Sequence, residues 1–228
     1  QGITILNNVT LESVSNDGDK PVITANNQNY TFDAVLYATG RKANTANIGL
    51  EHTDIATNER GAIVVNDTCE SSVPGVYAVG DVNGGPQFTY ISLDDFRIVF
   101  GALTGNSQYT LKDRKNIPYT TFLTPPLSRV GLTEEDAINQ GYTVKTKEML
   151  VATMPRAHVN DYLKGAFKIV VDADNDLILG ATLYSQGAEE LINLIKMAMD
   201  NNIPYTYFKN QIFTHPTMAE NLNDLCNF

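Results

Sequence analysis

The chain has 228 residues, of which 43% are hydrophobic and 18% are charged, a composition typical of a globular protein with enough apolar side chains for a core. Its formal net charge of −10 argues against binding to a nucleic-acid backbone. The charge favours a cytoplasmic protein whose partners are small molecules or other proteins. No apolar run approaches the roughly 20 residues that a membrane-spanning helix needs.

The first 38 residues alternate strand-like apolar segments with polar turns. Strands are expected at residues 2–6, 9–14, 22–24 and 33–38. The sequence NDGD at residues 16–19 favours a hairpin turn, and the asparagine-rich stretch that begins at Asn26 favours a second turn. This part of the chain is therefore expected to be a small β-meander.

Residues 41–116 are rich in loops, with short strands expected at 62–65 and 76–79 and a helix at 91–103. The second strand runs directly into Gly80 and Asp81. Ligands of open α/β sheets bind at the carboxyl ends of strands, glycine permits close approach to the backbone, and a helix start offers N–H groups and partial positive charge. Two interpretations are open: a site for a polyhydroxylated, partly anionic ligand, or an ordinary strand end before an amphipathic helix.

From residue 117 the pattern becomes that of an antiparallel sheet with helices, an α+β domain. Strands are expected at residues 119–123, 128–132, 142–153, 166–172 and 177–184. Thr133 is expected to cap a short helix ending at Gly141, because three acidic residues follow it and suit the helix dipole. A longer helix is expected at 188–201, where apolar residues recur at helical spacing, and a last short helix at 217–225.

The two cysteines, Cys69 and Cys226, lie far apart in the sequence. They form neither a C-x-x-C pair nor a metal-ligand cluster, and a single pair is too few for a disulfide framework. The chain is therefore predicted to carry two free thiols, as proteins of a reducing compartment do, and no metal site.

Four sequence blocks resemble motifs of the pyridine nucleotide-disulfide oxidoreductases and occur in the family's order. They are YATGRKAN at 37–44, VPGVYAVGD at 73–81, PPLSRVGLTEEDA at 125–137 and HPTMAE at 215–220. The second block is similar to the family's second flavin-binding motif, and the third is similar to the opening of its dimerisation domain. Residues 88–95 and 154–157 are most similar to the branch that contains mercuric reductase and the reactive-chlorine-resistance reductases.

This resemblance implies a fold in three parts. Residues 1–39 would be the tail of a nicotinamide-nucleotide domain, residues 40–116 the second half of an α/β flavin-binding domain, and residues 117–228 an α+β dimerisation domain that forms a two-fold homodimer. No G-x-G-x-x-G dinucleotide fingerprint occurs in the chain. We therefore expect the chain to be the C-terminal part of a longer FAD- and NAD(P)H-dependent oxidoreductase.

The resemblance also assigns cofactor contacts. Asp81 would accept a hydrogen bond from the ribityl chain of FAD, and Gly40 and Gly80 belong to the matched motifs. Phe88 and Thr89 would begin the helix that faces the isoalloxazine ring, where backbone N–H groups would bind a carbonyl oxygen of the flavin.

His215 and Glu220 would form the catalytic pair. Because a carboxylate fixes the tautomer of an imidazole and stabilises its protonated form, Glu220 is expected to orient His215. In the family, the matching histidine reaches across the dimer to the partner's redox disulfide and acts as acid–base, and its bond to the next proline is cis in relatives. His52 and His158 match no motif and are expected at the surface.

The family's electron path would run from NAD(P)H through FAD and a redox disulfide to a small disulfide, metal ion or oxidant. The cysteine pair of that disulfide is expected before residue 1, so the isolated chain is expected to bind neither FAD nor NAD(P)H and to be inactive. Two alternatives stay open. One is a single-cysteine NADH oxidase or coenzyme A-disulfide reductase of the same fold, which the pairing of His215 with Glu220 disfavours. The other is a non-catalytic dimerisation module.

Overall fold

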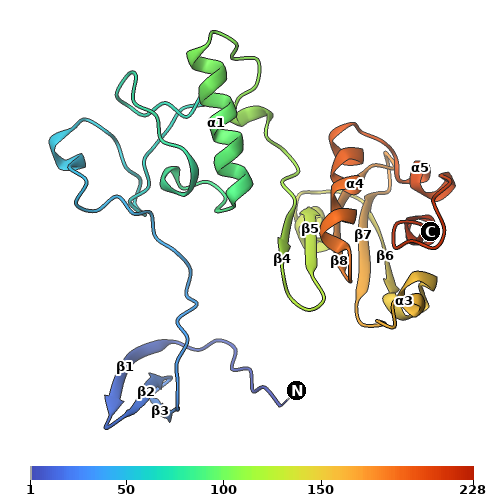
Figure 1. The fold of residues 1–228 in the computed structure, drawn as a ribbon, viewed down its shortest axis with the longest axis horizontal. Helices are drawn as coiled ribbons and strands as arrows, with labels where there is room; N and C mark the ends of the chain where they lie inside the picture. Colours follow the sequence, from blue (N-terminus) through green and yellow to red (C-terminus); the bar gives the residue numbers. More distant parts are fainter. Residues whose placement is uncertain (1) are drawn as a thin grey trace. The chain divides into compact units, whose positions relative to one another are not determined.

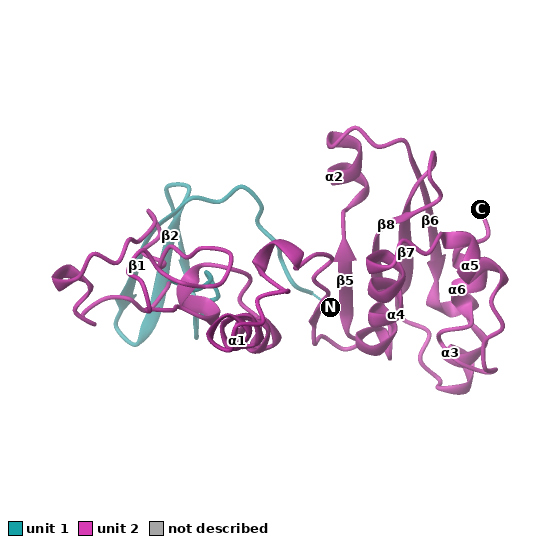
Figure 2. Ribbon diagram, turned by 90° about the horizontal axis from the view of Figure 1, so that it is seen from above, with its two compact units in different colours: residues 1–42 teal, residues 43–228 magenta. Residues whose placement is uncertain are grey.

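A computed structural model describes residues 2–228 and divides the chain into two compact units, residues 1–42 and 43–228 (Figure 2). Among the described residues, no helix combines the length and the apolar character that crossing a membrane requires.

The first unit is a three-stranded antiparallel meander, as expected. Its strands are β1 (Leu11–Asp17), β2 (Lys20–Ala25) and β3 (Gln28–Thr31), in the order β1-β2-β3. The β1–β2 turn pairs Asp17 with Lys20 and contains Gly18 with a positive φ of 61°. The expected strands at 2–6 and 33–38 are wrong, because neither segment pairs with another strand in the described part of the chain.

The first part of the second unit, residues 43–116, is mostly loop around one long helix. Its helices are the 3₁₀ turns η1 (Leu50–His52), η2 (Gly80–Asn83) and η3 (Leu111–Asp113) and the α-helix α1 (Thr89–Leu103). The expected helix is confirmed, and it begins two residues earlier than predicted. The expected strands at 62–65 and 76–79 are wrong, since only isolated bridges such as Glu70 with Tyr77 form there. A strand needs a continuous neighbour, and the described residues supply none.

The second part of this unit is built on a five-stranded antiparallel sheet of order β4-β5-β8-β7-β6 (Figure 1). The strands are β4 (Tyr119–Thr121), β5 (Leu127–Gly131), β6 (Val144–Leu150), β7 (Ala166–Asp172) and β8 (Ile178–Tyr184). All five were expected, although β6 ends earlier than predicted because the chain turns into the 3₁₀ turn η4 (Val151–Thr153). The α+β prediction for this region is confirmed.

Helices α2 (Glu134–Asn139) and α4 (Ala188–Asp200) were expected, while α3 (Pro155–Val159) and α5 (Tyr205–Asn210) were not. Thr133 caps α2 as predicted, because its hydroxyl accepts the backbone N–H of Asp136. The last helix, α6 (Asn221–Leu225), is shorter than predicted.

The core of the sheet domain lies between the sheet and its helices. Helix α4 packs on β5 and β8, and its buried side chains include Leu191, Ile192 and Ile195. Phe167 of β7 is fully buried in the same cluster, which also contains residues of α6. Because α6 is part of this core, the segment before it is held on a rigid support.

We predict that Phe167→Ala lowers the free energy of unfolding of residues 43–228 by about 3–5 kcal/mol, because it leaves a cavity in a close-packed core. Phe122→Ala is the matched control, since Phe122 is 78% exposed, and it should change the value by less than about 0.5 kcal/mol. Denaturant titration of the two variants measures both values. Equal losses would contradict the placement of the core.

Candidate functional site

The turn that carries Asp81 is shaped by Gly80. This glycine has a φ of +74°, in the left-handed region, and it lies against Ser92 of α1. A Cβ atom at residue 80 would lie 2.6 Å from the Ser92 hydroxyl oxygen. Both the backbone angle and the close approach to α1 therefore require glycine. Asp81 follows in η2 and is half-buried.

A buried carboxylate holds this turn on the helix. Asp95 of α1 is fully buried, and its Oδ2 accepts the Gly80 backbone N–H at 2.7 Å and the Asn83 side-chain amide at 2.9 Å. Both partners lie in η2. The start and the end of the turn are therefore bound to one oxygen atom of the helix.

The charge of Asp95 is balanced by Arg114, which follows η3. The guanidinium donates to Asp95 Oδ1 and, at 2.7 Å, to Asp94 Oδ2. Burial lowers the pKa of Arg114, but hydrogen bonds to Asp95 and Asp94 outweigh burial and raise this pKa above its usual value. The arginine therefore stays charged, as a buried carboxylate needs.

The start of α1 presents the other flavin-side residues expected from the sequence. Phe88 is the N-cap residue and Thr89 the first helical residue, and no side chain in the described part of the chain caps this end by hydrogen bonding. The Phe88 ring stacks on Tyr119 of β4, with ring centres 5.7 Å apart. The first N–H groups of α1 are thus in the position to receive an oxygen atom of a ligand.

A cavity of about 740 Å³ adjoins this helix start. It lies between α1, the segment that leads into β4, and α4, and Phe88 and Thr89 are among its lining residues. Arg97, Lys115 and Lys196 line it as well, so its charged groups are predominantly basic.

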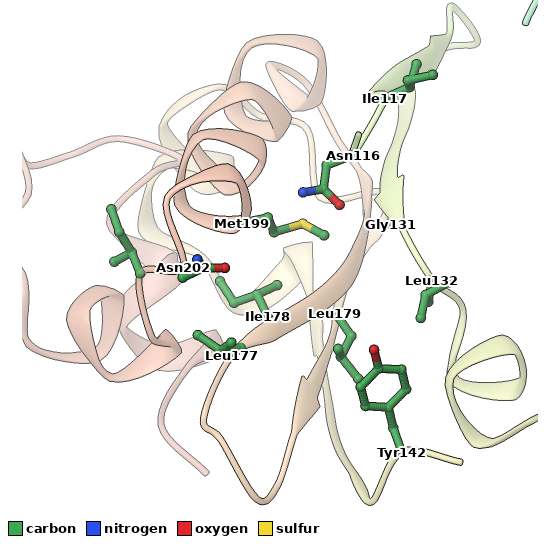
Figure 3. A pocket seen from close by; sticks show the side chains of 11 residues that line it. Asn116, Ile117, Gly131, Leu132, Tyr142, Leu177, Ile178, Leu179, Met199 and Asn202 are labelled. Carbon is green, nitrogen blue, oxygen red and sulfur yellow. The ribbon is translucent and has the colours of Figure 1, made fainter. Parts of the chain in front are cut away.

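A second cavity, of about 500 Å³, lies in the sheet domain beside β5, β8 and the end of α4. Figure 3 shows its lining, in which the side chain of Met199 lies beside the amide of Asn116. None of the residues predicted to bind a cofactor or to act in catalysis lines this cavity, and we assign it no part in the site.

His215 and Glu220 form the second group of predicted site residues, and the structure brings them together. His215 Nδ1 lies 2.8 Å from Glu220 Oε2, the imidazole side chain is 72% exposed, and the carboxylate side chain is 15% exposed. Because the carboxylate can only accept, Nδ1 carries the proton of this bond and Nε2 is left as the basic nitrogen of the neutral ring. The peptide bond between His215 and Pro216 is cis, as the resemblance to the family implies.

The pair is held by the segment around it. The Thr217 hydroxyl donates to the Thr214 carbonyl and accepts the Glu220 backbone N–H, which closes a local turn. Asn223 of α6 donates to the carbonyls of Phe208 and Gln211, at and just beyond the end of α5. Glu220 therefore stands on a helix fixed both by the core and by α5.

Gly40, the remaining predicted site residue, has a positive φ of 93° and is exposed in the first unit. The other four predicted cofactor-binding residues lie in the second unit and adjoin one end of α1. They are Gly80, Asp81, Phe88 and Thr89.

Sequence reasoning missed Asp95, Asn83 and Arg114. One signal for Asp95 is present in the sequence: it lies at helical spacing between Ile91 and Ile98, on the stripe that a helix buries. A carboxylate on such a stripe indicates a buried polar partner. Arg114 gives no such signal, because it lies in a charged stretch that resembles a linker.

Cys69 and Cys226 are free, as predicted, and the structure shows that both are buried. Burial is the largest effect on the pKa of the Cys69 thiol and raises it, and the nearby Asp95 carboxylate raises it further. Arg114 lowers this pKa, and the combined result is a pKa of about 11. Burial raises the pKa of Cys226 to about 12. No group of three or more His, Cys, Asp or Glu side chains among residues 2–228 is arranged to hold a metal ion.

Two family profiles match the chain. The pyridine nucleotide-disulphide oxidoreductase profile matches residues 1–95, and the dimerisation domain profile of the same family matches residues 117–226. The chain belongs to the pyridine nucleotide-disulfide oxidoreductase family. The predicted fold class, an α/β flavin-binding part followed by an α+β dimerisation domain, agrees with these matches.

Curated members of this family include similar oxidoreductases. The chain is 44% identical over 225 residues to the probable pyridine nucleotide-disulfide oxidoreductase RclA of Escherichia coli, covering 99% of the chain and 51% of that protein. It is 33% identical over 226 residues to a mercuric reductase of Staphylococcus aureus, covering 97% of the chain and 41% of that protein. The chain therefore spans about half the length of the curated relatives it matches.

Solved structures of flavoprotein reductases are also similar to the chain. The HOCl-induced flavoprotein disulfide reductase RclA of Escherichia coli matches with a TM-score of 0.89 and 44% identity over 95% of the chain and 50% of that structure. Its Cu(II) complex matches with a TM-score of 0.90 over 95% of the chain and 49% of that structure. LpdA of Mycobacterium tuberculosis, at 21% identity and a TM-score of 0.87, shares the fold.

The raised thiol pKa values predict that neither cysteine reacts with a thiol reagent in the folded chain at pH 8. A raised pKa keeps the thiol protonated up to a higher pH, and the thiolate is the reactive form. Labelling by a chromogenic disulfide reagent should stay slow until the pH nears about 11, the pKa of Cys69. Denaturant at pH 8 should release both thiols, and fast labelling without denaturant would contradict this burial.

Proposed function

We propose that the full-length protein is an FAD-dependent reductase that uses NADH or NADPH and a redox disulfide to reduce a small oxidant, metal ion or disulfide. The hydrogen bond between His215 and Glu220 carries this proposal, because it prepares an imidazole for proton transfer in a chain of this family. The predicted division into residues 1–39, 40–116 and 117–228 is part of the proposal. The acidic net charge of −10 suits a cytoplasmic enzyme with small-molecule substrates.

The residues around η2 and the start of α1 fit a flavin. Asp81 would accept a hydrogen bond from a ribityl hydroxyl, and the left-handed Gly80 leaves the backbone open to close approach. The uncapped N–H groups beside Phe88 and Thr89 would donate to a flavin carbonyl oxygen, and the helix dipole favours negative charge there by roughly 0.3–1 kcal/mol. Gly40 is a further proposed cofactor-binding residue. FAD, when bound, supplies hydride acceptance and electron transfer.

The outer face of α1 supports the idea that further chain completes the flavin domain. Leu93, Phe96, Phe100 and Leu103 lie on α1 and are 41–66% exposed. A run of large apolar side chains at helical spacing on a surface marks a region that another segment covers. We therefore expect the isolated chain to retain neither FAD nor NAD(P)H and to be inactive.

His215 would act as acid–base at the thiols of a redox disulfide in the partner subunit of a homodimer. Helix α1 lies beyond the β4 edge of the five-stranded sheet, whereas α6 packs on β6 and β7 at the other edge (Figure 2). The pair of His215 with Glu220, next to α6, is therefore distant from the residues at the start of α1 in its own chain. A second subunit related by two-fold symmetry can bring the two together. Residues 117–228 would form that homodimer, and the match to the dimerisation domain supports it.

The relatives support a proposal for the substrate class. A metal ion or a reactive-chlorine oxidant is the proposed electron acceptor, because the identity to RclA is 44% and that to mercuric reductase is 33%. RclA is described as an HOCl-induced flavoprotein disulfide reductase, and one of its structures is a Cu(II) complex.

In the full-length enzyme, His215→Ala should slow the thiol–disulfide step by about 10²–10⁴-fold, the usual contribution of a general acid–base group. Reduction of the flavin by NAD(P)H should change little, because that step precedes the thiols. Stopped-flow absorbance at the flavin band separates the two rates.

His52→Ala is the matched control, because His52 is also an exposed histidine near a glutamate, with Nε2 3.6 Å from Glu51 Oε1. It should leave both rates unchanged. Equal slowing of both steps by His215→Ala would reject the role assigned to this histidine.

A further inference from the structure

A fully buried carboxylate lies in the middle of an otherwise apolar helix face. Asp95 shares the buried face of α1 with Ile91 and Ile98. A charged group without contact to water is costly, so a carboxylate persists there only where it makes strong hydrogen bonds or ion pairs. Both oxygen atoms of the Asp95 carboxylate therefore need hydrogen-bond or ion-pair partners.

The two oxygens of Asp95 have separate partners. Oδ1 accepts from Arg114 and balances its charge there. Oδ2 accepts from Gly80 and Asn83, the first and last residues of η2. The second oxygen thus fixes both ends of the turn that presents Asp81, and it fixes nothing else in the described part of the chain.

We propose that Asp95 is a positioning residue for the flavin site, which holds η2 on α1 so that Asp81 and the start of α1 keep one fixed geometry. This inference rests on the proposed function. The physical reason is that a ligand bridging η2 and the helix start binds tightly only if the two are preorganised. Asp95 acts through the turn and does not touch the cofactor itself.

A comparison with Asp94 distinguishes the positioning role proposed for Asp95 from that of an ordinary member of a structural ion pair. Asp94 adjoins Asp95 in the sequence and binds the same guanidinium, with Oδ2 2.7 Å from Arg114 Nε. It also accepts a hydrogen bond from Tyr109. Within residues 2–228, none of the hydrogen bonds of Asp94 reaches η2. Loss of its charge therefore weakens the anchor of Arg114 and leaves the turn in place.

The test compares Asp95→Asn with Asp94→Asn in the full-length protein. Both changes keep the side-chain shape and remove one negative charge beside Arg114, so both should lower the melting temperature. Asp95→Asn should raise the dissociation constant of FAD by about tenfold or more, as expected when a hydrogen bond to a charged group is lost. It should also shift the visible absorbance of bound flavin. Asp94→Asn should leave the spectrum unchanged and the dissociation constant within about threefold of wild type.

A second variant keeps the proposal testable if Asp95→Asn fails to fold. Asn83→Ala removes the amide that shares Oδ2 with the Gly80 N–H and leaves the ion pair intact. It should also weaken FAD binding with an altered flavin spectrum. Wild-type affinity and spectrum in Asn83→Ala would overturn the proposal.

Two further outcomes separate this inference from the proposed function. If the wild-type full-length protein binds FAD but Asp95→Asn and Asp94→Asn weaken binding equally, Asp95 is only a structural ion-pair member and the inference fails alone. If the wild-type protein does not bind FAD, the proposed function fails, and the inference fails with it.

Discussion

The arrangement of the proposed flavin-binding residues in η2 and at the start of α1 depends on one buried hydrogen-bonding centre, the Asp95 carboxylate. It binds the Gly80 N–H and the Asn83 amide through one oxygen and Arg114 through the other. Three segments that are separate in sequence, the turn η2, helix α1 and the stretch before β4, therefore meet at one charge. Removing one partner of such a buried pair costs about 3–5 kcal/mol, because it leaves the other charge uncompensated. The left-handed Gly80 and the uncapped helix start can serve a ligand only while this centre holds them together.

Near the C-terminal end of the chain, the predicted catalytic side chain is exposed and is held in place by a buried support. His215 stays exposed, and its orientation comes from a hydrogen bond to Glu220, which is mostly buried. Glu220 is fixed in turn because Leu222 and Leu225 of α6 are fully buried in the core beneath the sheet. A mobile imidazole would spend little time in a productive position, whereas this one is held by a rigid support. Exposure of the ring and rigidity of its support are the combination that delivery to another subunit requires.

The sequence allowed most of the sheet domain to be predicted. Strand β7 and helix α4 have strong periodicity and were placed to within a residue or two. The strand expected at 76–79 was wrong, since its local apolar pattern needs neighbouring strands that the described residues do not contain. Helices α3 and α5 are too short to show a period. The contact of His215 with Glu220 was predicted from a motif, whereas Asp95 was missed because a carboxylate within a helix is normally on its surface.

The central claim is that His215 serves a redox disulfide in the partner subunit, and hybrid dimers test it most directly. One protomer carries His215→Ala, and the other lacks its redox cysteines. If the histidine acts across the two-fold axis, each hybrid has one intact site, and mixing two inactive proteins restores oxidoreductase activity. If the histidine acts within its own subunit, no site in the hybrid is complete. A mixture that forms hybrid dimers and stays inactive would contradict the account.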